Sequence, residues 1–155
     1  MEPVQCGGRS TQILPTSVLD RHYILQSVTN YPTKANTTIG ITTSKDHTDV
    51  LVNLSTGNNN VSTISFDNLT YHAGETIHDQ LDSFQIMWLK CQSEIFRIDI
   101  KSSDPIAVFY GQDGGVGRQL LPVSRWGKHF ISFPISETAD TIQITGNTQL
   151  HYYCT

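Results

Sequence analysis

The sequence carries little charge. Of its 155 residues, 15% are Asp, Glu, Lys or Arg, against roughly 25% in an average soluble domain. The net charge at pH 7 is -4, and no basic stripe is present, which argues against nucleic acid as a partner. No apolar run approaches the roughly 20 residues of a membrane-spanning helix, and the first residues lack the apolar core of a signal peptide. The length suits one domain. The charge and the short apolar runs predict that this domain neither binds nucleic acid nor inserts into a membrane.

Cysteine is scarce, with three in the chain: Cys6, Cys91 and Cys154. An odd number in a secreted chain leaves one thiol for a partner elsewhere. We expect a disulfide between Cys91 and Cys154, with Cys6 pairing outside this sequence. Pairing of Cys6 with Cys91 and three buried thiols in a cytosolic chain are the alternatives. The spacing matches no zinc pattern, because zinc sites pair their ligands a few residues apart.

Motifs for catalysis are absent from the sequence. The glycine-rich loop 111–117 is not followed by the Lys-Ser/Thr of a phosphate-binding loop, and no Gly-x-Ser-x-Gly elbow occurs. His47 and His78 have carboxylates beside them but lack the spacing of metal ligands or acid–base pairs; calcium held by loop carboxylates is the alternative. His22 and His129 recur in matching positions, which favours a shared packing role. We expect no enzymatic activity, no cofactor and no metal.

Thr, Ser and Asn replace the missing charges, with 18 Thr, 14 Ser and 8 Asn. This composition is typical of extracellular β-proteins, because strands favour Thr and other β-branched residues. Half of the asparagines begin an Asn-x-Ser/Thr acceptor for N-glycosylation: Asn36, Asn53, Asn60 and Asn68. These sites predict a secreted glycoprotein, and chance in a Ser- and Thr-rich chain is the alternative.

Short alternating segments run through the chain, separated by turn residues. The expected strands are 22–29, 37–43, 48–54, 61–66, 84–89, 95–101, 105–110, 129–133, 141–145 and 149–154. Residues 84–89 are large on both faces, as in a central strand, and residues 74–84 are the one place where a short helix would fit. About ten short strands predict an all-β fold, a two-sheet β-sandwich-like module with mostly antiparallel strands.

One phrase is written twice, 107 residues apart, at residues 14–24 and 121–131. Leu, Pro, Ser, His and Ile recur in place, and a long internal period marks a repeated unit. We expect a flexible tail or linker over 1–11 and a single β domain over 12–155. Within that domain one repeat unit covers 14–120 and a second starts at 121–155, with further domains in a larger chain. Trp126 of the second copy is expected in the core, and sugar stacking is the alternative.

Four segments, in the same order and spacing, resemble the IgGFc-binding protein N-terminal domain family. Residues 121–130 match its Leu-Pro-x-Ser-x-Trp-Gly-Lys-x-Phe phrase, and residues 102–111 match its Ser-x-x-Pro-Val-Ala-Val-Phe-x-Gly segment. Residues 38–50 are similar to its strand, acidic turn and Thr-x-Val strand, and residues 73–75 fit its Gly-Glu turn. The resemblance covers about residues 12–133.

The resemblance implies a secreted or surface-associated multidomain protein, often one with mucin-type or von Willebrand type D modules. It brings no catalytic residues, and the Fc binding behind the family's name is not carried over. We therefore expect an extracellular, non-catalytic binding or structural module of a mucus, matrix or adhesive protein, whose partners are other extracellular proteins or glycans. The alternative is a lectin-like carbohydrate-binding β-sandwich, which would expose Trp88, Trp126 or Tyr152 on one face.

Overall fold

The computed structural model describes residues 13–26, 37–55, 63–91, 97–112 and 117–127. In these residues the backbone forms strands and two short 3-10 turns, and no helix there is long and apolar enough to cross a membrane. The elements are η1 (Thr16–Val18), β1 (Asp20–Gln26), β2 (Thr37–Thr43), β3 (Thr48–Leu54), β4 (Thr63–Phe66), β5 (Leu69–His72), β6 (Thr76–Leu81), β7 (Ile86–Cys91), β8 (Arg97–Gln112), β9 (Arg118–Gln119) and η2 (Val123–Arg125).

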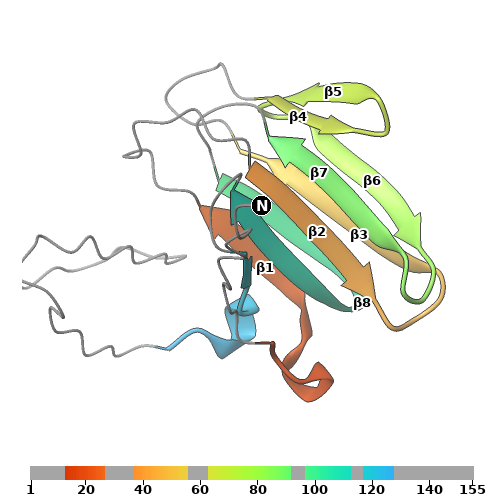
Figure 1. The fold of residues 1–155 in the computed structure, drawn as a ribbon, viewed down its shortest axis with the longest axis vertical. Helices are drawn as coiled ribbons and strands as arrows, with labels where there is room; N and C mark the ends of the chain where they lie inside the picture. Colours follow the sequence, from red (N-terminus) through yellow and green to blue (C-terminus); the bar gives the residue numbers. More distant parts are fainter. Residues whose placement is uncertain (1–12, 27–36, 56–62, 92–96, 113–116, 128–155) are drawn as a thin grey trace, which may run out of the picture.

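These strands join into one hydrogen-bonded sheet in which every pair is antiparallel (Figure 1). The order is β5-β4-β7-β2-β8-β3-β6, and β1 and β9 both pair with β8. The sheet curves until it is nearly barrel-shaped. The all-β class and the antiparallel pairing predicted from the sequence are confirmed.

Strand β8 holds this sheet together. It is 16 residues long; its first half pairs with β1 and β3, and its second half pairs with β2 and β9. The sequence predicted two strands here, because Pro105 lacks an N–H and interrupts a ladder. No described strand pairs with residues 103–105, and the register of β1 shifts at the same place. The proline therefore sits where the strand changes partners and no ladder bond is required of it.

The core is lined by every second residue of the strands. In β3, Val50, Val52 and Leu54 point inward, as the alternation predicted, and Asn53 between them is only half-buried. The buried core consists of Tyr23, Leu25, Ile39, Ile41, Val50, Val52, Leu54, Ile64, Ile77, Leu81, Met87, Leu89, Cys91, Ile98, Ile100, Ile106 and Val108. Burial of this apolar surface is the main force that stabilises the fold.

The helix considered for residues 74–84 is wrong, because β6 occupies this segment and pairs with β3. Ile77 and Leu81 are both buried. Residues four apart share a face in a strand as well as in a helix, so this spacing did not separate the two structures. The short strands β5 and β9 were not anticipated. The predicted tail 1–11 and the predicted strands 129–133, 141–145 and 149–154 lie outside the described residues.

Candidate binding face

One side of β7 is buried and the other faces solvent. The large residues on both of its faces are typical of a central strand that is covered on both sides, and in this respect the structure differs. Exposed and buried residues alternate throughout Ile86–Cys91. Trp88 is 55% exposed and Ile86 is 50% exposed, and Lys90 is exposed beyond them. A large aromatic on a strand surface is more informative than a buried one, because soluble domains seldom expose clustered large apolar side chains without a partner.

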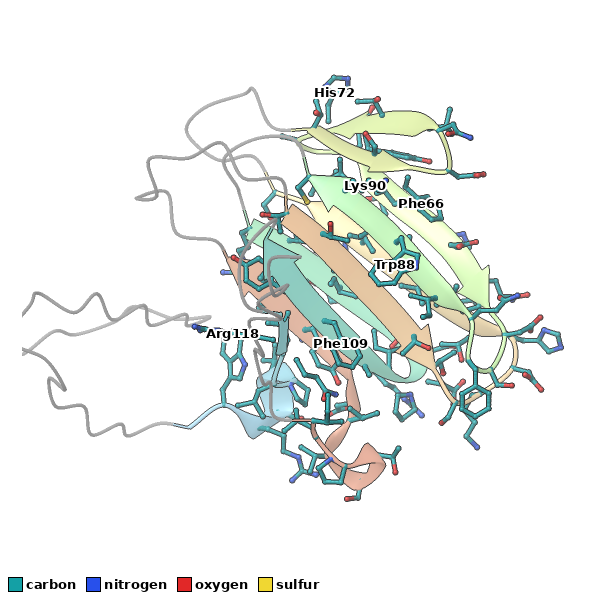
Figure 2. All side chains as sticks on the ribbon, in the orientation of Figure 1. Phe66, His72, Trp88, Lys90, Phe109 and Arg118 are labelled. Carbon is teal, nitrogen blue, oxygen red and sulfur yellow. The ribbon has the colours of Figure 1, made fainter. Side chains whose placement is uncertain are left out.

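Trp88 lies in a row with Gly40 and Phe109. Gly40 of β2 is the register partner of Trp88 on one side and of Phe109 of β8 on the other. Directly paired residues of antiparallel strands project from the same face. Figure 2 shows Trp88 and Phe109 on the viewed face of the sheet. We call Trp88, Gly40 and Phe109 the aromatic row.

Gly40 provides the space in which the Trp88 ring lies. A Cβ atom placed on Gly40 would stand 3.0 Å from Cζ3 of Trp88, which is tighter than nine in ten real Cβ contacts. A glycine inside a strand normally weakens it, because it packs nothing and loses the most backbone freedom on folding. The indole covers this gap across the strands, so one of its faces rests on the sheet while the ring remains largely in solvent.

The positions around the aromatic row are neutral apart from Lys90, which pairs with Thr38 of β2 and Ser65 of β4. Together with the aromatic row they form what we call the outer face: Ile86, Trp88, Lys90, Thr38, Gly40, Thr42, Ala107, Phe109 and Gly111. None of these described positions is a carboxylate, a cysteine or a histidine. The outer face therefore offers stacking, hydroxyl groups and one cation, and no acid, base or metal ligand.

His47 in the β2–β3 turn and His78 in β6 do not form the clusters that their sequence neighbours suggested. His47 Nδ1 lies 3.4 Å from Asp82 Oδ1, and His78 Nε2 lies 3.6 Å from Asp49 Oδ1. Asp46 accepts the Ser83 N–H at 2.9 Å, which lowers the pKa of its carboxyl group. The His47–Asp82 and Asp46–Ser83 contacts fasten the β2–β3 turn to the β6–β7 turn, and the His78–Asp49 contact joins β6 to β3. Across the described ranges no three His, Cys, Asp or Glu side chains gather as metal ligands would.

A further polar contact lies where β1 meets β8. His22 Nε2 is 3.2 Å from Asp99 Oδ2, and Lys101 Nζ is 3.8 Å from Asp99 Oδ1. Asp99 Oδ1 is buried and has no hydrogen-bond partner among the described residues. His22 thus ties β1 to β8. Its counterpart His129 lies outside the described residues, so the predicted shared packing role stays a prediction.

The two copies of the repeated phrase begin with the same turn in the residues that the structure describes. Pro15 precedes η1 with φ -65° and ψ 151°, and Pro122 precedes η2 with φ -65° and ψ 152°. In each copy a backbone N–H three residues on donates to the proline carbonyl at 2.9 Å. The copies also lie close together, because the Ser124 hydroxyl of the second donates to Asp20 of the first, and the Leu14 N–H donates to Gln119 Oε1, just before the second copy, at 2.7 Å. Figure 1 shows both turns at the same end of the sheet.

Trp126 is half-buried beside η2, and its indole N–H donates to the Leu121 carbonyl at 3.2 Å. It is not among the fully buried core residues. Trp88 is therefore the more exposed of the two tryptophans, and Tyr152 lies outside the described residues. The sequence identified Trp88 as one of three aromatics that a carbohydrate-binding face would expose. It predicted no role for Gly40 or Phe109, because only the strand register brings them beside Trp88.

Cys91 ends β7 as a buried thiol, 1% exposed. Its burial raises the pKa of the thiol to about 12. Cys6 and Cys154 lie outside the described residues, so the predicted pairing with Cys154 stays a prediction.

Two of the four glycosylation sites fall within the described residues. Asn68 is exposed at the tip of the β4–β5 hairpin, where Asp67 and Asn68 have φ of 47° and 62°. Asn53 is half-buried in β3, and its Oδ1 accepts the Thr76 hydroxyl at 2.9 Å. Asn36 and Asn60 lie outside the described residues.

Comparison with known proteins gives one match. The family model described as IgGFc binding protein matches residues 9–153, which is nearly the whole chain. No curated protein matches the sequence, and no solved structure matches the fold. The match extends beyond the segments that carried the resemblance, at both ends. With that coverage, the chain belongs to the IgGFc binding protein family.

Proposed function

We propose that the chain is an extracellular, non-catalytic binding module and that a partner docks on its outer face. Membership of a binding family supports the binding role. The observation that carries the choice of face is the exposure of Trp88 above Gly40. Tryptophan is enriched among the residues that dominate binding energy, since it buries a large area at a small cost in side-chain entropy.

The chemistry of the outer face favours binding over catalysis. Its described positions supply an aromatic surface, hydroxyl groups and Lys90, with no nucleophile beside a base. The partners that suit it are other extracellular proteins or their glycans, and the module would belong to a mucus, matrix or adhesive protein.

A purified mucin tests this proposal directly. Binding of the intact chain to the immobilised mucin is compared with binding of Trp88→Ala and of Leu69→Ala. Leu69 is the matched control, because it is 59% exposed on β5 but lies outside the outer face. We expect Trp88→Ala to lose about tenfold or more in affinity, or about 1.4 kcal/mol, and Leu69→Ala to bind normally. If Trp88→Ala bound the mucin as tightly as Leu69→Ala did, the outer face would not be the binding surface.

Carbohydrate binding is the second candidate, and the same exposed Trp88 favours it, because one face of a sugar ring stacks on an aromatic ring. Thr38 and Thr42 flank the aromatic row and can exchange hydrogen bonds with sugar hydroxyls. Removing the O-glycans from the mucin separates the two candidates. If binding disappears with the glycans, the partner is carbohydrate; if it persists and still needs Trp88, the partner is protein.

The strand pairing supports a finer division of the sheet. We infer that β8 links two layers, one containing β5, β4, β7, β2 and β9 and the other containing β1, β3 and β6, as in a β-sandwich. The similar turns at Pro15 and Pro122 support the proposed repeat, with one unit over residues 14–120 and a second from 121, inside one domain over 12–155.

We also propose N-linked glycans at all four acceptor sites and a disulfide between Cys91 and Cys154. Asn68 should be the most fully occupied of the two described sites, because it is exposed in a tight turn, whereas Asn53 is bound to Thr76. Expression through a secretory pathway, followed by peptide mass spectrometry, measures the occupancy. Full occupancy of Asn53 with a bare Asn68 would contradict this order.

A further inference from the structure

The two repeated phrases share a backbone conformation at their proline and the 3-10 turn after it, but they differ in what covers these residues. Pro122 of the second phrase is buried, whereas Pro15 of the first is exposed. The likeness continues toward the N-terminus, since Gln12-Ile13 precedes the first phrase and Gln119-Leu120 precedes the second. Leu120 packs against the core, whereas Ile13 is 63% exposed.

The second phrase is held by contacts to β8 and β1. The Leu120 N–H donates to the Val108 carbonyl in the second half of β8 at 2.8 Å. The Ser124 hydroxyl donates to Asp20 at the start of β1, and η2 packs against β1. We call the surface that receives Leu120, Pro122 and Ser124 the socket. It consists of the second half of β8 and the first residues of β1.

Among the residues that the structure describes, the first phrase presents the same groups without a socket. Ile13, Pro15 and Ser17 take the places of Leu120, Pro122 and Ser124, and all three are exposed. The turn at η1 is already formed by its own backbone bonds, so docking would require little further ordering. An apolar side chain and a proline that are covered in the second phrase but exposed in the first indicate a missing partner.

We propose that the first phrase docks into the socket of a second unit of this same fold, through the contacts that the second phrase makes within its own unit. This inference rests on the repeat organisation proposed above and is independent of the outer face. The partner must supply an acceptor carbonyl on a β8-like strand for the Ile13 N–H, apolar cover for Pro15 and a carboxylate for Ser17.

Vacating the socket in the full-length chain tests the proposal. In the opened variant, Leu120→Asn and Pro122→Ser weaken the second phrase, so that the first phrase of another molecule can enter. The blocked variant adds Ile13→Asn and Pro15→Ser, which weaken the first phrase equally. We expect the opened variant to reach at least twice the mass of one chain by light scattering as its concentration rises. The blocked variant should keep the mass of one chain at the same concentrations.

Association that persists in the blocked variant, or no association of the opened variant, overturns the proposal. Changing Ile13 and Pro15 alone should lower the thermal midpoint only slightly, because both are exposed and only the restriction that Pro15 places on the unfolded chain is lost. Binding to the mucin through Trp88 is measured on the same proteins. We expect it to be unchanged whether or not the opened variant associates, because the two surfaces are independent.

If the opened variant does not fold, a graft decides the question. The graft variant carries the residues of the first phrase in the second position, through Arg118→Thr, Leu120→Ile, Val123→Thr, Arg125→Val and Trp126→Leu. Its control has the same composition with two residues exchanged, Arg118→Ile and Leu120→Thr. A graft that unfolds close to the unmodified chain, well above the control, supports the proposal. A graft as unstable as its control overturns it, because the first phrase then does not fit the socket.

Discussion

Replacing Gly40 by alanine should move the Trp88 ring without unfolding the sheet. The new Cβ would stand 3.0 Å from Cζ3 of Trp88 and 3.4 Å from both Cε3 and Cη2. Carbon atoms pack best at about 3.5–4.0 Å, so the ring must withdraw by about half an ångström at its nearest atom. It can do so by tilting toward solvent, because these atoms are the far end of a flexible, largely exposed side chain.

Two opposing effects set the change in the free energy of unfolding. Alanine restricts the unfolded chain, which stabilises the fold by about 0.5–1 kcal/mol. Displacing the three ring atoms nearest Gly40 loses about 0.1–0.2 kcal/mol for each contact, or about 0.3–0.6 kcal/mol in all. The net change for Gly40→Ala should therefore lie within about 0.7 kcal/mol of zero. Gly40→Val places further methyl groups against the ring and should destabilise by about 1–3 kcal/mol, as overpacking does.

Fluorescence and urea unfolding measure the two quantities separately. The sequence has two tryptophans, so the experiment is made in a Trp126→Phe background in which emission reports Trp88 alone. We expect emission from Gly40→Ala to move to longer wavelength, because the raised ring is more hydrated, while the urea midpoint changes little.

Gly111→Ala is the matched control on the same face. Among the described residues, a Cβ atom there would meet the Gly117 Cα at 3.6 Å, which is ordinary contact. This variant should be as stable as the unmodified chain or more so, with Trp88 emission unchanged. The reasoning is refuted if Gly40→Ala leaves the emission of Trp88 where it was, or if Gly111→Ala shifts it equally.

Three further predictions concern the core and the β1 start. Tyr23→Phe should lower the free energy of unfolding by about 1–3 kcal/mol in urea titrations, because the buried Tyr23 hydroxyl donates to the Ile106 carbonyl at 2.6 Å. With any disulfide reduced, the Cys91 thiol should not react with a chromogenic disulfide at pH 8 until urea is added, since burial raises its pKa to about 12; rapid reaction of the folded chain would contradict this. The hydrogen bond from Ser124 holds the pKa of Asp20 below its ordinary 3.8. The ionised Asp20 carboxylate therefore stabilises the fold fully above pH 3.8, and this contribution is lost as the pH falls through the lowered pKa. Asp20→Asn should abolish this part of the acid dependence of the thermal midpoint.

Strands whose alternation was bounded by turn residues were predictable from the sequence. The predicted strands 37–43 and 48–54 coincide with β2 and β3. The alternation of these segments and the turn residues 44–47 between them are local signals, so they are present in the chain before it folds. In the folded chain, His47 of this turn has φ of 55°, and buried Thr43 and Thr48 flank the turn with their hydroxyls 3.2 Å apart.

Features that depend on pairing between distant segments were not predictable. Nothing local distinguishes a break at Pro105 from a change of partners within β8, and Ile77 and Leu81 fit either kind of element. The same limit applies to the candidate site. Trp88 was recognisable as an aromatic of interest, but its position over Gly40 follows from the register of β2 with β7, which is set 48 residues apart in the chain.

The repeated phrase shows both cases at once. Its turn is determined locally, because proline fixes φ near -65°, and the backbone bond back to the proline carbonyl recurs with the same length in both copies. Its environment is determined by tertiary contacts, which cover Pro122 but leave Pro15 exposed. Exposed turns accept many sequences, so the turn alone does not explain why its neighbours recur. In both copies a Leu stands between an apolar residue and the proline, and a Ser follows two residues after the proline. The recurrence of the docking residues, and not of the turn alone, is therefore the reason to look for a second socket.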